Sequence, residues 1–362
     1  ELRNVKKEYG QERRTRIEAE VEEINYDKTA MIANERVVVT VSRDGYLKRV
    51  SMRSYNAVGD QETAIKDGDV LIGTTECDTL DTLLLFTSKG NYASIPVWQI
   101  EEGKWKDVGM HLNKVVRIDG EDKIKNAILI KSFDTYAWIV TVSSAGQIKK
   151  TPVNNWQVER NNKVMTAMNL GKGAEMINAF IVYSNQQILM VSKDGYSYRF
   201  AVEDIPATGV KSKGVKAMNL GKGDALAWGC VMNAEDPAVL FMTNVGQMKR
   251  VHTEEIVFGN RPMKGNLICK RLKTNPSIVT LAKAVSAGEE LVFKDPERQV
   301  IRASEIPLKP RESGFGSPLV LKDGWNLYRG IDECRIIDIP TDADNEVHED
   351  VERLSLFDEK EG

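Results

Sequence analysis

The sequence has 362 residues and a formal net charge of −3, with 50 lysines and arginines against 53 aspartates and glutamates. It contains no apolar run of about 18 residues and no basic-then-apolar leader, so we expect neither a membrane span nor a signal peptide. Its four cysteines are scattered, without the paired spacing of a disulfide framework or a zinc site, and we expect isolated reduced thiols and no metal.

The charge is distributed unevenly along the chain. Residues 331–362 contain twelve acidic and three basic residues, a net charge of −9, and because the whole chain carries −3, residues 1–330 carry +6. A basic body with an acidic tail indicates a nucleic-acid surface and an electrostatic competitor for it, although an ordinary solubilising tail fits the charge equally well. We expect residues 341–362, which hold few apolar side chains, to form an acidic, disordered tail.

The chain opens with a predicted helix. Glutamate, lysine and arginine dominate residues 1–24, apolar anchors such as Leu2 and Val5 recur, and no proline intervenes. Gly10 is expected to interrupt the helix. We interpret residues 1–25 as a helical connector from a preceding domain, so we expect the sequence to be a piece of a longer protein.

One short pattern then repeats: an apolar run, a turn and a second strand that carries lysine or arginine. It is found at residues 37–50, 83–95, 138–151, 188–200, 239–251 and 290–302, and in the copy at residues 83–95 the lysine, Lys89, lies in the turn. A β-branched run followed by a glycine-containing turn and another run predicts a β-hairpin, because glycine adopts the positive φ that such turns require. The sixth copy replaces the glycine with Asp295-Pro296-Glu297.

The repeat predicts an all-β fold built from six units over residues 26–340. A single hairpin cannot bury its apolar face, so units of about fifty residues must stack or close into a ring. Further apolar stretches between the hairpins give each unit about four strands. We predict a propeller-like disc with each unit a blade; a linear β-solenoid is the competing architecture.

Cations recur at similar places in successive units, which would form a basic band around one edge of a disc. The candidate DNA-binding residues are Arg43, Lys48, Arg49, Lys89, Lys149, Lys150, Lys193, Arg199, Lys211, Lys213, Lys249, Arg250, Arg261, Lys264, Lys270, Arg271 and Arg302. Phosphate contacts need charge but no base code, so such a band suits the backbone of a bent duplex. The alternative is a strand edge that lysines protect from pairing with other strands.

We find no catalytic constellation in the sequence. His111, His252 and His348 are isolated, and no serine or cysteine occupies a recognisable nucleophile elbow. We therefore expect no catalytic residue in this chain.

Three segments carry a resemblance to a known family. They are EYGQERRTRI at residues 8–17, GYLKR at residues 45–49 and DTLLLFTSKG at residues 81–90. Up to about residue 340, the chain resembles the C-terminal domain of the A subunit of bacterial type IIA topoisomerases, gyrase and topoisomerase IV. The resemblance implies a six-bladed β-pinwheel, in which neighbouring blades exchange strands and a basic outer rim binds and bends duplex DNA.

The resemblance also separates the two enzymes. Gyrase carries a Gln-Arg-Arg-Gly-Gly-Lys-Gly box after the first hairpin, whereas residues 58–64 here read VGDQETA, without arginine. Topoisomerase IV is therefore the better match. The segment at residues 8–17 is similar to the end of the breakage-reunion core, so the nucleophilic tyrosine is expected upstream.

The resemblance implies a non-catalytic domain that presents a transported duplex to the cleavage core for decatenation and supercoil relaxation. The implied partners are double-stranded DNA, bound without sequence preference, the rest of the A subunit, and the B subunit in a heterotetramer. We expect no cofactor in this chain, with ATP and magnesium used elsewhere in the enzyme, and a cytoplasmic, nucleoid-associated location. A gyrase wrapping domain and a propeller-like protein-interaction scaffold remain the alternatives.

Overall fold

A computed structural model describes residues 1–11, 31–59, 61–158, 160–270, 277–294, 299–316, 326–328 and 330–338. The chain divides into two compact units, residues 1–33 and residues 34–362. Most of the predicted connector, the acidic tail of residues 341–362, and Arg271 lie outside the described residues. In the first unit, helix α1 (Leu2–Tyr9) ends where the Gly10 amide donates to the carbonyl of Lys6 at 3.0 Å. The interruption predicted at Gly10 is confirmed.

The six predicted hairpins are present in the second unit. Their strands are β1 (Arg36–Ser42) with β2 (Tyr46–Ser51), β4 (Thr82–Thr87) with β5 (Asn91–Pro96), β8 (Trp138–Ser143) with β9 (Gln147–Pro152), β12 (Gln187–Ser192) with β13 (Tyr196–Ala201), β16 (Ala238–Thr243) with β17 (Met248–His252), and β20 (Glu290–Lys294) with β21 (Gln299–Arg302). Gly45 turns the first hairpin with a φ of +93°, a conformation that glycine adopts without a steric cost. In the first five hairpins the turn forms where the sequence places its glycine, and the turn of the sixth lies outside the described residues.

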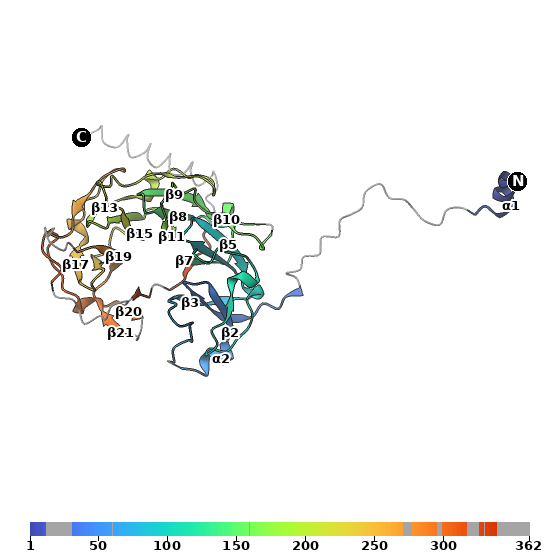
Figure 1. The fold of residues 1–362 in the computed structure, drawn as a ribbon, viewed down its shortest axis with the longest axis horizontal. Helices are drawn as coiled ribbons and strands as arrows, with labels where there is room; N and C mark the ends of the chain where they lie inside the picture. The colour runs from blue at the N-terminus through green and yellow to red at the C-terminus, as the bar shows by residue number, and fades with distance from the viewer. Residues whose placement is uncertain are drawn as a thin grey trace, which may run out of the picture. The chain divides into compact units, whose positions relative to one another are not determined.

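Every hairpin is flanked by an inner strand. The inner strands are β3 (Leu71–Asp78), β7 (Ile124–Ile130), β11 (Met176–Val182), β15 (Leu226–Met232), β19 (Val279–Val285) and the two-residue β22 (Asn326–Leu327). Together the described strands form six sheets, and Figure 1 shows their inner strands facing a common centre. The predicted all-β, propeller-type fold is confirmed, and the linear solenoid alternative is wrong.

Neighbouring sheets exchange a strand. The exchanged outer strands are β6 (Met110–His111), β10 (Met165–Thr166), β14 (Val215–Lys216) and β18 (Asn266–Leu267). Strand β6 follows the second hairpin in the chain but pairs with β2 of the first, and the other three likewise pair with the preceding hairpin. Among the described strands, the first four sheets are therefore each completed by the sequence of the next repeat.

Short helices connect the hairpins to the strands that follow. Helix α2 (Met52–Asn56) follows the first hairpin, and the 3-10 helices are η2 (Val97–Gln99), η3 (Leu112–Lys114), η4 (Val153–Trp156), η5 (Val202–Asp204), η6 (Thr253–Glu255) and η7 (Ala303–Glu305).

The hydrophobic core lies between sheets rather than in one central mass. Five clusters of buried side chains each join two consecutive sheets. In the cluster between the second and third sheets, Phe86 and Trp156 are fully buried, with ring centroids 5.2 Å apart in an edge-to-face arrangement. Such aromatic pairs add to the stabilisation that burial alone gives.

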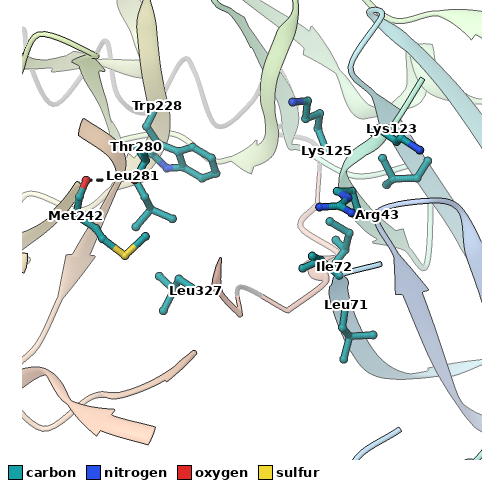
Figure 2. A pocket seen from close by; sticks show the side chains of 12 residues that line it. Arg43, Leu71, Ile72, Lys123, Lys125, Trp228, Met242, Thr280, Leu281 and Leu327 are labelled. Atoms are coloured by element: carbon teal, nitrogen blue, oxygen red, sulfur yellow. Dashed lines mark hydrogen bonds between the residues drawn. The ribbon is translucent and has the colours of Figure 1, made fainter. Parts of the chain in front are cut away.

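Hydrogen bonds also link successive inner strands around the centre. The Asn126 side chain donates to the carbonyl of Ala179 at 2.5 Å, and Asn178 donates to that of Gly229 at 3.0 Å. A cavity of ≈ 290 Å³ lies at the centre, where Figure 2 shows Trp228 and Leu327 opposite Arg43 and Lys125.

A strap, defined as residues 326–328 and 330–338, crosses the centre from the sixth sheet. The Tyr328 amide donates to Val292 in that sheet, and the Tyr328 hydroxyl accepts from the Thr74 amide of the first sheet at 2.7 Å. Strand β23 (Asp332–Cys334) then pairs in parallel with β7 of the second sheet. The strap ends at the third sheet, where the Arg335 amide donates to the Tyr183 hydroxyl at 2.8 Å. It therefore contacts four of the six sheets.

The described residues contain no helix that is long and apolar enough to cross a membrane. They also contain no group of three or more His, Cys, Asp or Glu side chains that could hold a metal ion.

Candidate nucleic-acid interface

The 3-10 helices lead into linking loops along the outer edge of the preceding sheet. We define the linking loops as residues 100–109, 157–164, 206–214, 257–265 and 307–316. In the first linking loop, the backbone of Glu102 forms an isolated parallel β-bridge with Arg49 of β2. Met110, just after the loop, pairs with Leu47 of the same strand. Between these two anchor points the loop passes Lys48, so the first linking loop covers the cation-bearing second strand of a hairpin.

Three of the predicted surface lysines are buried beneath these loops. Lys48 is 1% exposed, and Lys149 and Lys249 are 0% exposed. Each lies three residues after its turn glycine and directs its ammonium group into a linking loop. The prediction that these three lysines lie on an exposed rim is wrong, because their side chains point beneath the loop that crosses the strand.

The ammonium groups are enclosed by backbone carbonyls, in what we call carbonyl cages. Lys48 donates to the carbonyls of Trp105 at 2.6 Å and Asp107 at 2.5 Å. Lys149 donates to those of Ala167 and Val210, the latter at 2.5 Å. In the fifth sheet, Lys249 donates to the backbone carbonyl of Arg311 at 2.9 Å and to that of Ser313 at 2.7 Å.

An aromatic ring completes each cage. The ammonium nitrogens lie 5.5 Å from the Trp105 ring, 4.8 Å from the Trp156 ring and 5.3 Å from the Phe315 ring. Burial lowers the pKa of Lys149 to about 7 and the pKa values of Lys48 and Lys249 to about 8. These lysines bond to their own protein rather than to a ligand at the surface.

In the third and fifth sheets, the next residue along the second strand reaches a 3-10 helix or the residue that ends it. Lys150, 8% exposed, donates to the carbonyl of Val202 at 2.9 Å, and Arg250, 9% exposed, donates to that of Ile306 at 2.9 Å. Burial also lowers the pKa of Lys150. The rim placement of these two residues is wrong for the same reason. Arg49 and Arg199 are half-buried, and Arg199 donates to the carbonyl of Ile256 at 3.1 Å.

Arg43 lies at the centre rather than at the outer edge. Figure 2 shows it lining the central cavity with Lys123 and Lys125, and its guanidinium donates to the Gly68 carbonyl at 2.8 Å. The turn that carries Arg43 is directed toward the inner side of the first sheet, so its predicted place on the outer band is wrong.

The remaining predicted cations reach the solvent. Lys89, Lys193, Lys211, Lys213, Lys264, Lys270 and Arg302 are exposed, and Arg261 is half-buried. Lys89 forms an ion pair with Asp119, and Arg302 lies 3.9 Å from Glu290. Within the described part of the chain, Lys193, Lys211 and Lys213 form no ion pair. Contact between these cations and DNA stays a prediction.

The linking loops hold further cations that the sequence analysis did not select. Lys104, Lys106, Arg160 and Lys163 are exposed, and Lys309 and Arg311 are half-buried. They occur in successive repeats at a similar distance after the turn, and that spacing could have identified them. With Lys211, Lys213, Arg261 and Lys264, they give every linking loop two basic side chains.

Known proteins have a similar sequence and a similar architecture. The sequence matches the DNA gyrase C-terminal domain family, described as a β-propeller, at residues 36–59, 81–131, 137–182 and 186–228. A crystal structure of the C-terminal domain of DNA topoisomerase IV is 31% identical with a TM-score of 0.74, covering 82% of this chain and 93% of that one. The chain belongs to the DNA gyrase C-terminal domain family.

Full-length relatives in this family are longer than this chain. The A subunit of DNA topoisomerase 4 from Bacillus subtilis is 34% identical over 314 residues, which are 86% of this chain and 39% of the relative. The corresponding protein of Staphylococcus aureus (strain MRSA252) is 34% identical over 289 residues, 79% of this chain and 36% of the relative. The chain thus spans 39% of the length of the Bacillus relative. A gyrase A C-terminal domain structure, 20% identical with a TM-score of 0.63 and covering 82% of this chain and 98% of that one, shares the fold.

In this member of the gyrase C-terminal domain family, the segment at the position of the gyrase box contacts the first linking loop. The Trp105 indole donates to the carbonyl of Gln61 at 2.7 Å, and the Thr63 hydroxyl donates to the Trp105 carbonyl at 3.1 Å. The same carbonyl accepts from Lys48. The segment therefore helps to place the loop that carries Lys104 and Lys106.

Proposed function

We propose that residues 34–338 form a non-catalytic domain that binds and bends duplex DNA in the A subunit of a topoisomerase IV. The observation that carries the proposal is the recurrence of solvent-facing lysines and arginines in successive linking loops. Because the loops run along the outer edges of consecutive sheets, a duplex that follows those edges would meet cations at regular intervals. Membership of the gyrase C-terminal domain family supports the same function.

The chemistry of these side chains favours binding without sequence preference. Flexible ammonium groups contact phosphate oxygens, which carry no base information. Bending a site of 20–30 base pairs costs on the order of 1–6 kcal/mol, so several loops must act together. About six phosphate contacts would give a log–log dependence of affinity on salt with a slope near −5.

The similarity to the A subunits of DNA topoisomerase 4 supports the wider assignment. In the whole enzyme, the domain would present a transported duplex to the cleavage core for decatenation and supercoil relaxation. The active-site tyrosine, ATP hydrolysis and magnesium would belong to other parts of a heterotetramer with the B subunit, which acts on the chromosome in the cytoplasm. The absence of arginine from residues 58–64 favours topoisomerase IV over gyrase.

Binding should be measured by fluorescence anisotropy on duplexes of increasing length, each across a salt titration. We expect affinity to rise with length beyond one helical turn. Replacing Lys104, Lys106, Lys211 and Lys213 together with alanine should weaken binding and lower the salt slope by up to about 4. Lys125→Met removes a charge from the central cavity shown in Figure 2 and should leave affinity unchanged.

The same measurements separate the alternatives. Weak binding that ignores duplex length would contradict the DNA-binding function and favour a protein-interaction scaffold. A ligation assay of DNA topology would distinguish strongly chiral wrapping, which gyrase requires, from the bending proposed here.

A further inference from the structure

The carbonyl cages are formed by the same loop segments that carry the exposed cations. The Trp105 carbonyl, which accepts from Lys48, lies between Lys104 and Lys106 in the chain. The Val210 carbonyl, which accepts from Lys149, immediately precedes Lys211. A carbonyl that points inward to an ammonium group fixes the peptide plane beside it. Each cage therefore constrains the backbone from which the neighbouring cations project.

Glycine fixes the end of each of these two loops. Gly109 and Gly214 have φ values of +90° and +79°, and each directly precedes an outer strand. A side-chain carbon at Gly214 would collide with the carbonyl oxygen of Ile148. Only glycine allows the loop to approach the strand this closely in this conformation. With the bridge of Lys150 to Ala207 at its start, the third sheet's loop is held at both ends and at its middle.

Two other sheets provide comparisons inside the same molecule. In the fourth sheet, Tyr198 takes the position of the caged lysine, and its hydroxyl donates to the Ala217 carbonyl. In the second sheet, the position holds Ala93, whose methyl group cannot donate a hydrogen bond. Val164 stands there in place of the glycine that precedes the outer strand.

We propose that Lys48, Lys149 and Lys249 are positioning residues for DNA binding, each holding the cations of one linking loop in a single arrangement. The inference rests on the proposed function, because it concerns how those loops meet a duplex. The buried ammonium groups touch no DNA themselves. A flexible loop loses conformational entropy when it binds DNA, and this loss weakens affinity. The buried ammonium groups order the loop before binding, so the loss on binding is smaller.

The third sheet gives the sharpest test. In the 362-residue chain, Lys149→Met keeps an unbranched apolar side chain beneath the loop but removes its donors. We expect the Kd for a duplex of about 42 base pairs, four helical turns, to rise by about three- to tenfold. In the free protein, hydrogen exchange should accelerate at the amides of residues 208–214, while those of β8 and β9 keep their protection.

A double-mutant cycle separates positioning from general destabilisation. If Lys149 acts through the loop, Lys149→Met should have little effect in a Lys211→Ala/Lys213→Ala background, because no cations remain there to position. An equal rise in Kd in both backgrounds would overturn the proposal. So would an unchanged Kd for Lys149→Met alongside weakened binding by the Lys211/Lys213 variant. Failure of the unmodified chain to bind duplex DNA would instead reject the proposed function.

A second variant decides the question if Lys149→Met fails to fold. Gly214→Ala disturbs the end of the same loop while leaving Lys149, Lys211 and Lys213 in place. Its Kd should also rise, and the increase should disappear in the Lys211→Ala/Lys213→Ala background. An effect of Gly214→Ala that persists without the two lysines would overturn the proposal. Gly171→Ala, where an added carbon meets nothing within 4 Å, is the matched control and should bind normally.

Discussion

The junctions between consecutive sheets are built differently from the junction between the sixth sheet and the first. At each of the five consecutive junctions, buried apolar side chains from both sheets form one of the core clusters. Between the sixth and first sheets, the described contacts come from the strap, through the Tyr328 hydroxyl and the packing of Gly330 and Ile331 on Gly73. Five junctions depend on area removed from water, whereas the sixth depends on directed hydrogen bonds and one close backbone approach.

This difference predicts unequal stability around the centre. Apolar burial contributes about 25 cal/mol per Å², so a cluster of a dozen or more buried side chains resists local opening. A net hydrogen bond contributes only about 0.5–1.5 kcal/mol. The strap junction should therefore open first, before the consecutive junctions separate.

The largest effect is expected from a consecutive junction. Phe86→Ala removes a fully buried ring that packs against Trp156, and such truncations typically cost about 3–5 kcal/mol. The midpoint of urea unfolding should fall substantially. Leu80→Ala, at a side chain that is 41% exposed, is the control and should change it little. Equal shifts for the two variants would contradict a core placed between the sheets.

The next effect is expected from the close approach under the strap. An added carbon at Gly73 would lie 2.5 Å from the carbonyl carbon of Gly330 and 2.6 Å from Cγ1 of Ile331. Gly73→Ala should displace the strap at a cost of about 1–3 kcal/mol, typical of overpacking. Limited trypsin digestion should then cleave faster after Arg335. Cleavage at the rate of unmodified protein would mean that the strap is not held at Gly73.

A smaller and more local effect is expected at Tyr328. Tyr328→Phe removes the acceptor of the Thr74 amide while retaining the ring, and should cost about 0.5–1.5 kcal/mol. Hydrogen exchange at the Thr74 amide should accelerate by up to about tenfold, as 1.4 kcal/mol implies. The Tyr183→Phe variant tests the far end of the strap through the amide of Arg335. Protection at Thr74 should be unaffected by that second change.

The smallest effect is expected from the ion pair between β7 and the strap. Lys131 and Glu333 lie 2.6 Å apart with 31% and 41% of their side chains exposed, so Lys131→Met should cost only about 0.2–1 kcal/mol, and less at high salt. The hydrogen bond to Glu333 raises the pKa of Lys131 above 10.5. The stabilisation from this ion pair is therefore fully present below pH 10.5 and is lost as the pH rises through the raised pKa of Lys131. Chemical unfolding of both proteins from about pH 9.5 to about pH 11.5, one unit either side of the ordinary lysine value of 10.5, would measure the onset of this loss.

The hairpins could be predicted because their signals are local. A β-branched run, a turn glycine and a second run occupy adjacent positions in the chain, and every predicted hairpin formed. The burial of Lys48 was not predicted, although the alternation of side chains along a strand could have indicated it. Successive residues of a strand point to opposite faces, so Lys48 and Arg49 could not both lie on one outer surface.

The strap and the cages could not be predicted in the same way. The strand register of Cys334 against Ile130 joins residues far apart in sequence, and neither segment carries a local signal for the other. The cage around Lys149 is formed by carbonyls at Ala167 and Val210, and any residue type presents a carbonyl. Backbone acceptors of this kind leave no trace in side-chain patterns.

The exchange of outer strands puts the repeats of the sequence out of step with the sheets in space. A deletion from Gly90 to Gly146, one turn glycine to the next, would remove strands from three sheets, and a chain cut between hairpins would leave the preceding sheet with an unpaired edge. Cutting before β10 would uncover β5 in this way, and uncovered edges invite pairing with other chains. A repeat can therefore be gained or lost without exposing an edge only when a hairpin keeps the linking loop and outer strand that follow it in the chain.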